Sequence, residues 1–210
     1  MKKLDLRKIY KDLYLPSARK VVVVEVPDFQ FVMIDGRIEK GQGPGTSPAF
    51  QEAMQALFGA AFTLKFMSKL RKENAIDYPV MALEALWWVE DGRFDITQPD
   101  NWRWRAMIMQ PDHITAEMFT EALGKIRQKR PSPSVKKLRL KRFCEGLCIQ
   151  TMHIGPYATE PATLERMQAY AAENGYALQN EHHEIYLGDP RRAAPEKLKT
   201  VLRRAMKKKK

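Results

Sequence analysis

The chain has 210 residues, of which 44% are hydrophobic, and its formal net charge at pH 7 is +11. This length and composition suffice for a folded domain with a buried core, and no apolar run reaches the roughly 18 residues of a membrane-spanning helix. The charged N-terminus lacks the apolar stretch of a secretory signal. The two cysteines, Cys144 and Cys148, are therefore expected to be free thiols in a reducing cytoplasm.

The positive charge is concentrated at the N-terminus, in residues 125–142 and in the tail from Arg191 onward. Charge in tails and linkers is usually solvated surface. The sequence contains no helix-turn-helix, zinc-finger or RNA-binding aromatic motif. A basic surface is therefore favoured over a nucleic-acid partner, and no attached DNA-binding domain is expected.

In chain order, the pattern first predicts a strand at 20–26 that stops before Pro27, and a second strand at 31–38. The elements that follow are a helix at about 48–72, an apolar strand at 78–90, an alternating strand at 101–110, a helix at 115–130 capped by Thr115, a linker at 131–134 and a strand at 139–155. Helices interspersed with antiparallel strands indicate the α+β class.

Two parts of the chain resemble each other in the same order. FVMIDGRI (31–38) matches IQTMHIGPY (149–157), and SPAFQEAMQAL (47–57) matches EPATLERMQAY (160–170). Each copy predicts a strand, a glycine turn and a helix with proline in its first turn. Ordered correspondence across these elements indicates an internal duplication.

The duplication predicts a first unit at about 20–110 and a second at about 138–190. Ser47 and Glu160 directly precede the helix prolines, where a cap or a favourable N-terminal charge belongs. Two such units packed about a pseudo-twofold axis leave a cleft between them, which is a common place for a ligand.

Histidine and carboxylate residues meet in EHHEIYLGDPRR, residues 181–192. On a strand, His182 and His183 point to opposite faces, so they cannot both bind one ion, and no H-E-x-x-H spacing is present. Hydrogen-bonded structural histidines are favoured over a metal site. No phosphate-binding glycine loop or nucleophile motif occurs either, so neither a metal nor a cofactor is predicted.

The tryptophans gather on the two middle strands, as Trp87, Trp88, Trp102 and Trp104. Core packing explains most tryptophans, but tryptophans and tyrosines beside a carboxylate also make a cage for flat or cationic molecules. Glu84 shares a strand face with Trp88, and Glu184 shares one with Tyr186. A carboxylate among apolar rings tends to be neutral, so it could donate a proton or bind a cation. The pattern alone leaves core and cage open.

Several longer motifs resemble the GyrI-like small-molecule-binding family. They are LEALWWVEDGRFD (83–95), NWRWRAMIMQPDHIT (101–115), QTMHIGPYATEPATLERMQAY (150–170) and HHEIYLGDPRRAAPEKLKTVLR (182–203). The resemblance covers about residues 18–205 and leaves a basic N-terminal extension, 1–17, and a lysine tail, 206–210. It implies two strand–helix–strand–strand units around a central aromatic pocket.

The resemblance also implies a site. Glu184 matches the family's glutamate on a late strand, and the catalytic candidates are Glu184 and Tyr157. The ligand-binding candidates are Trp87, Trp88, Trp104, Tyr186 and Glu84. Stand-alone members resemble cyclopropanoid cyclopropyl hydrolases, which open the cyclopropane of DNA-alkylating natural products such as yatakemycin and so detoxify them. Glu184 would deprotonate a water, and Tyr157 or Tyr186 would donate a hydrogen bond to the dienone oxygen.

A second interpretation uses the same cage without chemistry. Some members of the resembled family bind lipophilic cations in multidrug-sensing regulators, so a non-catalytic binder or sensor of such drugs is the alternative. Either way the expected partner is a small aromatic or amphipathic molecule rather than a membrane or a nucleic acid.

Overall fold

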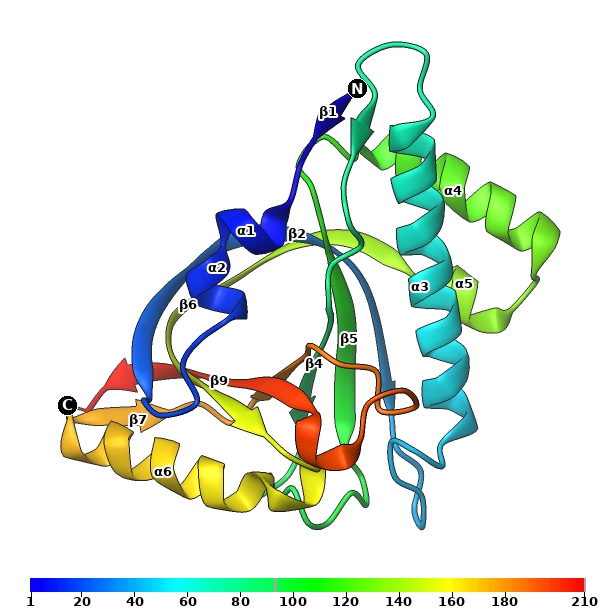
Figure 1. Ribbon diagram of the computed structural model, residues 1–210. Helices are drawn as coiled ribbons and strands as arrows, with labels where there is room; N and C mark the ends of the chain where they lie inside the picture. Colours follow the sequence, from blue (N-terminus) through cyan, green and yellow to red (C-terminus); the bar gives the residue numbers. More distant parts are fainter. Residues whose placement is uncertain (93, 210) are drawn as a thin grey trace.

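The computed structural model describes residues 1–92 and 94–209, so Arg93 and Lys210, the last residue of the predicted lysine tail, lie outside the described residues (Figure 1). Its strands are β1 (Lys2–Lys3), β2 (Val22–Arg37), β3 (Ile76–Asp77), β4 (Leu83–Trp88), β5 (Arg103–Gln110), β6 (Arg139–Ile154), β7 (Tyr176–Leu178), β8 (His182–Tyr186) and β9 (Lys199–Lys208). Its helices are α1 (Leu6–Ile9), α2 (Lys11–Tyr14), α3 (Pro48–Lys69), α4 (Ala116–Lys129), α5 (Pro133–Lys137) and α6 (Glu160–Glu173), with short 3-10 turns at Tyr157–Thr159 and Pro195–Lys197. No helix in these ranges is long and apolar enough to cross a membrane.

The long strands close into a ring. Their order is β6-β2-β5-β4-β8-β9, and a further pairing of β6 with β9 joins the two ends. Every pairing in the ring is antiparallel. A closed ring gives each strand an inner and an outer face, and successive side chains alternate between these faces.

The predicted internal duplication is visible in the order of the elements. The first unit is β2, α3, β4 and β5, and the second is β6, α6, β8 and β9, which extends past residue 190. Equivalent strands pair across the ring, β2 with β6 and β4 with β8, as a pseudo-twofold axis requires. The α+β prediction is confirmed, and Figure 1 shows α3 and α6 outside the strands.

Helices α3 and α4 begin directly after a capping side chain, whereas α6 begins at Glu160 without a side-chain cap hydrogen bond. The Ser47 and Thr115 hydroxyls each accept a hydrogen bond from the backbone nitrogen three residues later, at 3.4 and 3.3 Å. The linker predicted at 131–134 is wrong in its second half. Pro133 begins α5 there, because the Ser132 hydroxyl accepts a hydrogen bond from the backbone nitrogen two residues later.

Helix α6 is held against the outer face of the second unit by a small core. Met167 and Ala171 are buried there against Ile149 of β6 and Leu202 of β9. Fully burying an aliphatic side chain contributes roughly 1.5–3 kcal/mol. This packing fixes the start of α6, and with it Glu160, relative to β8.

Pro27 does not end the first strand, contrary to the prediction. β2 continues through it as one strand, and the pairing with β6 skips Pro27 and the opposite residue, Glu145. Proline has no N–H for the ladder, and the adjacent Gly146 has a φ of 69° that favours glycine. The interruption lets the Glu145 side chain reach His183 at 2.9 Å.

The N-terminal extension folds onto the ring. Leu13 and Tyr14 are buried, and the Tyr14 hydroxyl donates a hydrogen bond of 2.6 Å to Glu84. Gln150 and Arg203 donate in turn to backbone carbonyls of α2. Figure 1 shows α1 and α2 within the arc of β2 and β6. The extension therefore covers polar groups inside the ring.

Gly36 lies directly against the indole ring of Trp104. A Cβ at this position would lie 2.1 Å from the ring of Trp104. Gly36→Ala should therefore lower the free energy of unfolding by about 1–3 kcal/mol, the usual cost of overpacking. Urea denaturation measures this, with Gly45→Ala as control because a Cβ there meets nothing within 4 Å. Equal losses in both variants would contradict the close approach.

Candidate functional site

Glu184 lies in the middle of β8 on the outer face of the ring. Its neighbours across the sheet are Ala85 of β4 and Leu202 of β9. The alternation of a strand places His182 and Tyr186 on the same face. Glu184 is only 7% exposed, and a buried carboxylate needs hydrogen-bond donors to remain charged.

Two side chains of β8 supply those donors. The Nε2 of His182 lies 2.9 Å from one Glu184 oxygen, and the Tyr186 hydroxyl donates to the other. Since a carboxylate only accepts, the histidine nitrogen is the donor. Burial by itself would raise the pKa of Glu184, but the His182 and Tyr186 hydrogen bonds outweigh it and lower the pKa. Glu184 is therefore charged. The apolar residues around it in the sequence had suggested a neutral carboxyl group instead.

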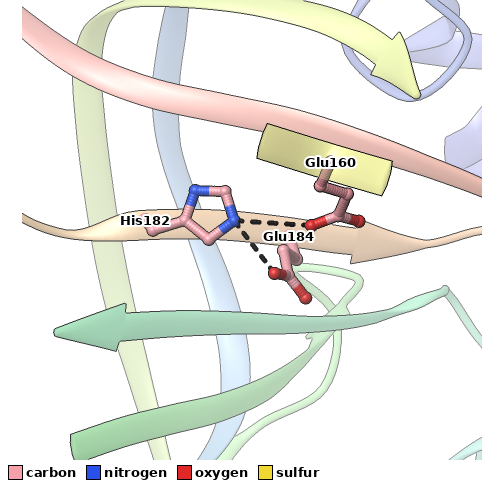
Figure 2. Close-up of side chains that lie close together, drawn as sticks. All are labelled: Glu160, His182 and Glu184. Carbon is pink, nitrogen blue, oxygen red and sulfur yellow. Dashed lines mark hydrogen bonds and ion pairs between the residues drawn. The ribbon is translucent and has the colours of Figure 1, made fainter. Parts of the chain in front are cut away.

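A second glutamate faces this group from α6 (Figure 2). Glu160 has no solvent exposure, and its Oε2 lies 3.9 Å from His182 Nε2. Neither of its carboxyl oxygens has a hydrogen-bond partner among the described residues. Burial, and then the charge of Glu184, raise the pKa of Glu160 to about 10.

Aromatic rings surround the two glutamates. Phe94 stacks on His182 with ring centres 5.6 Å apart, and its ring is tilted against that of Trp102 at 4.8 Å. Tyr157 meets the edge of Tyr186 at 5.9 Å. Tyr157 is 36% exposed, so the site approaches the surface beside this ring.

The tryptophan cluster continues from the site into the core. The Trp87 indole nitrogen donates a hydrogen bond of 3.0 Å to the Tyr186 hydroxyl, which links it to Glu184. Phe50 of α3 contacts both Trp87 and Trp104, with ring centres 5.3 and 5.0 Å apart. Trp87 therefore links the site to Phe50 of α3, and Trp104 packs against the same phenylalanine.

Glu84 lies on the other face of the sheet. It pairs with Ile185, the neighbour of Glu184 in β8, and contacts His183 at 3.1 Å. His183 in turn contacts Glu145, which also contacts Arg203 at 3.3 Å. Glu84 thus belongs to a buried charge network inside the ring, apart from Glu184.

Two surface hollows lie near the middle strands. One, of about 500 Å³, is lined by residues around the β4–β5 loop, including Arg37, Glu90 and Arg103. The other, of about 430 Å³, includes Trp88 and Glu181. Glu184 lines neither hollow.

The structure brings several predicted site residues together and separates others. Glu184, Tyr157, Tyr186 and Trp87 lie together, Trp104 lies behind them, and Glu84 and Trp88 lie elsewhere. The contributions of Glu160, His182, Phe94 and Phe50 were not predicted. The position of Glu160 at a helix start was visible in the sequence, but its contact with β8 was not.

One group has donors suited to a metal. Glu160, His182 and Glu184 each offer an atom, and these atoms lie within 4.8 Å of one another. Carboxylate oxygen and imidazole nitrogen suit zinc, manganese or iron. The sequence prediction of no metal and no cofactor stays a prediction.

Solved structures of high similarity come from Listeria innocua. An uncharacterised conserved protein is 36% identical, with a TM-score of 0.88 and coverage of 97% of this chain and 100% of that one. A protein described as a hydrolase is 35% identical, with a TM-score of 0.85 and coverage of 98% and 100%. Another described as a hydrolase is 33% identical, with a TM-score of 0.82 and coverage of 97% and 100%.

More distant likeness shows the fold alone. The C-terminal domain of EcmrR is 11% identical with a TM-score of 0.53, covering 90% of this chain and 98% of that one. No curated protein matches the chain. The model of the GyrI-like small molecule binding domain matches residues 19–203. The chain therefore belongs to the GyrI-like family.

Proposed function

We propose that the site around Glu184 binds a small aromatic or amphipathic molecule and hydrolyses the cyclopropane ring of DNA-alkylating natural products. The observation that carries this proposal is a buried, charged carboxylate held by two donors beside aromatic rings. The similarity to two Listeria innocua proteins described as hydrolases supports it. Such an activity would detoxify the compound in the cytoplasm, which suits the two free thiols.

The mechanism starts from the charge of Glu184. A carboxylate must be ionised to take a proton from water, and the hydrogen bonds from His182 and Tyr186 keep it so. These bonds also make Glu184 a weak base. Ring strain and the positioning of water against the strained carbon would compensate for that weakness.

The two tyrosines have different roles in this proposal. Tyr186 has one hydroxyl proton, which it uses in a hydrogen bond to Glu184, and its oxygen accepts a hydrogen bond from Trp87. Within the described ranges, the Tyr157 hydroxyl has no such partner, and burial with the nearby Glu184 raises the pKa of Tyr157 to about 12. Tyr157 therefore stays protonated and would donate to the dienone oxygen as charge develops there.

Phenylalanine substitutions separate the two roles. Tyr157→Phe should lower kcat by about 10²-fold with little change in stability, because one oxyanion donor is lost from a partly exposed ring. Tyr186→Phe should lower the free energy of unfolding by about 1–3 kcal/mol, because Trp87 and Glu184 lose a buried partner. Turnover assays and urea denaturation of both variants measure this. Identical behaviour of the two would contradict the assignment.

A direct test is incubation of the purified protein with a cyclopropane-bearing alkylator, with the product followed by mass. A gain of one water, with protein-dependent kinetics, would support hydrolysis. An unchanged alkylator would overturn the proposed chemistry.

A second candidate is binding without turnover, as for a sink or sensor of lipophilic cations. It is favoured by the position of the charged Glu184 beside Tyr157 and Tyr186, since aromatic faces and a carboxylate attract cations. Saturable quenching of tryptophan fluorescence by a flat cationic dye, without any turnover of the alkylator, would favour this candidate.

A further inference from the structure

Glu160 is a buried acid that the proposed mechanism does not use. Its side chain has no solvent exposure, and no described residue forms a hydrogen bond with either oxygen. An isolated charged carboxylate in such a place is strongly destabilising. Glu160 is also the first residue of α6, where the helix dipole favours negative charge, but this effect is much weaker than desolvation. Desolvation therefore outweighs the dipole, and the side chain must be neutralised.

The histidine that faces Glu160 lies closer to Glu184 than to Glu160. The titratable groups that face it are Glu184, His182 and Tyr186 of β8, and Tyr157 of the preceding turn. The His182 nitrogen that lies 3.9 Å away points its proton to Glu184 at 2.9 Å. A proton on Glu160 itself is the remaining source of neutrality.

We propose that Glu160 and Glu184 form a proton-sharing pair in which Glu160 is the neutral acid and Glu184 the charged base. One carboxyl oxygen of each glutamate lies within 4.8 Å of the other. Their environments differ as this requires, since Glu184 accepts hydrogen bonds from His182 and Tyr186, and Glu160 accepts none from the described residues. Two carboxyl groups whose surroundings separate their proton affinities are a recurrent acid–base arrangement. The site then carries one negative charge rather than two, so it suits a neutral or singly positive ligand.

The next step rests on the proposed hydrolysis. In that reaction, the pair also accounts for both proton transfers. The water oxygen bonds to the ring carbon, the cyclopropane carbon–carbon bond breaks, and its electron pair moves to the dienone oxygen. Glu184 takes the proton of the water, and Glu160 supplies the proton that the dienone oxygen gains. Transfer of one proton from Glu184 to Glu160 then restores the pair.

A metal ion is the competing way to neutralise Glu160, since the same three residues have suitable donors. A histidine that binds a metal usually donates its second ring N–H to an acceptor. The Nδ1 of His182 has no partner in the part of the chain that the structure describes. This arrangement favours the proton.

The test is the pH dependence of unfolding in wild type and Glu160→Gln, measured by urea denaturation from about pH 5 to about pH 8 with a chelator present. A carboxyl whose pKa is raised in the folded state stabilises that state at low pH and loses this contribution as pH rises. Relative to Glu160→Gln, the unfolding constant of the wild type should therefore increase about tenfold per pH unit. Glu165→Gln is the matched control, because Glu165 is exposed on the same helix. The ratio of the wild-type unfolding constant to that of Glu165→Gln should not change with pH.

If the ratio of the wild-type unfolding constant to that of Glu160→Gln does not change with pH, the proton-sharing pair is wrong. The pair is also wrong if zinc or manganese raises the melting temperature of the wild type but not that of Glu160→Gln, because a cation would then replace the proton. Turnover gives a separate readout, in which Glu160→Gln should lose about 10²-fold in kcat and keep its affinity. A tenfold change of this ratio per pH unit, without turnover by the wild type, would support the pair and reject the hydrolase. Turnover without this pH dependence would support the hydrolase and reject the pair.

Discussion

Glu184→Gln should lower the hydrolysis of a cyclopropane substrate by about 10²- to 10⁴-fold, the usual contribution of a general base, and leave its affinity nearly unchanged. Glutamine keeps the shape of the side chain but cannot take a proton from water. Its carbonyl oxygen can still accept from Tyr186, and its amide can donate to His182 in the other tautomer. The change therefore removes the base and keeps the surroundings.

Product mass and tryptophan quenching, measured on the same preparation, separate turnover from affinity. Glu181→Gln is a suitable control, since Glu181 is exposed and directly precedes β8. It should turn over substrate as the wild type does. Full turnover by Glu184→Gln would show that another group activates the water.

The second large effect concerns His183, which lies inside the ring between two carboxylates. Its ring nitrogens lie 3.1 Å from Glu84 and 2.9 Å from Glu145. Burial alone would lower the pKa of His183, but the charges of Glu145 and Glu84 outweigh it and raise the pKa to about 9. His183→Gln should lower the free energy of unfolding at pH 6 by about 3–5 kcal/mol, because it leaves buried charge uncompensated.

This loss should depend on pH with a definite sign. A histidine whose folded pKa is raised gives its full stability below the unfolded pKa of about 6.5, and loses it as pH rises through about 9. The difference between wild type and His183→Gln should therefore be constant up to about pH 6.5 and shrink between about pH 6.5 and about pH 9. Urea denaturation across this range measures the difference.

His113 provides a control of opposite sign. It is half-buried, and burial followed by the charge of Arg71 lowers its pKa. Removing it should therefore affect stability more as pH rises through its own titration, which lies below the ordinary histidine range. A His183→Gln difference that stays constant up to pH 9 would mean that folding does not raise the pKa of His183.

The sequence by itself determined the local structure and the duplication. The caps at Ser47 and Thr115 act within three residues, so their effect is readable from the chain. The placement of Glu184 and Tyr186 on one face follows from the alternation of a strand. The strand end predicted at Pro27 was wrong because the missing N–H of Pro27 lies where the pairing of β2 with β6 is interrupted, opposite Glu145. The local sequence does not show which strand pairs with which, so it could not reveal this interruption.

Only the tertiary structure decided what each glutamate does. Glu84 and Glu184 both lie in apolar strands with aromatic neighbours, and the strand pattern by itself does not distinguish them. Ring closure places Glu84 inside with Tyr14 and His183, and Glu184 outside with Glu160. The charge of a buried carboxyl depends on the donors, charges and water around it, and packing brings these from distant parts of the chain. The sequence therefore predicted the glutamate, and the fold selected its proton state.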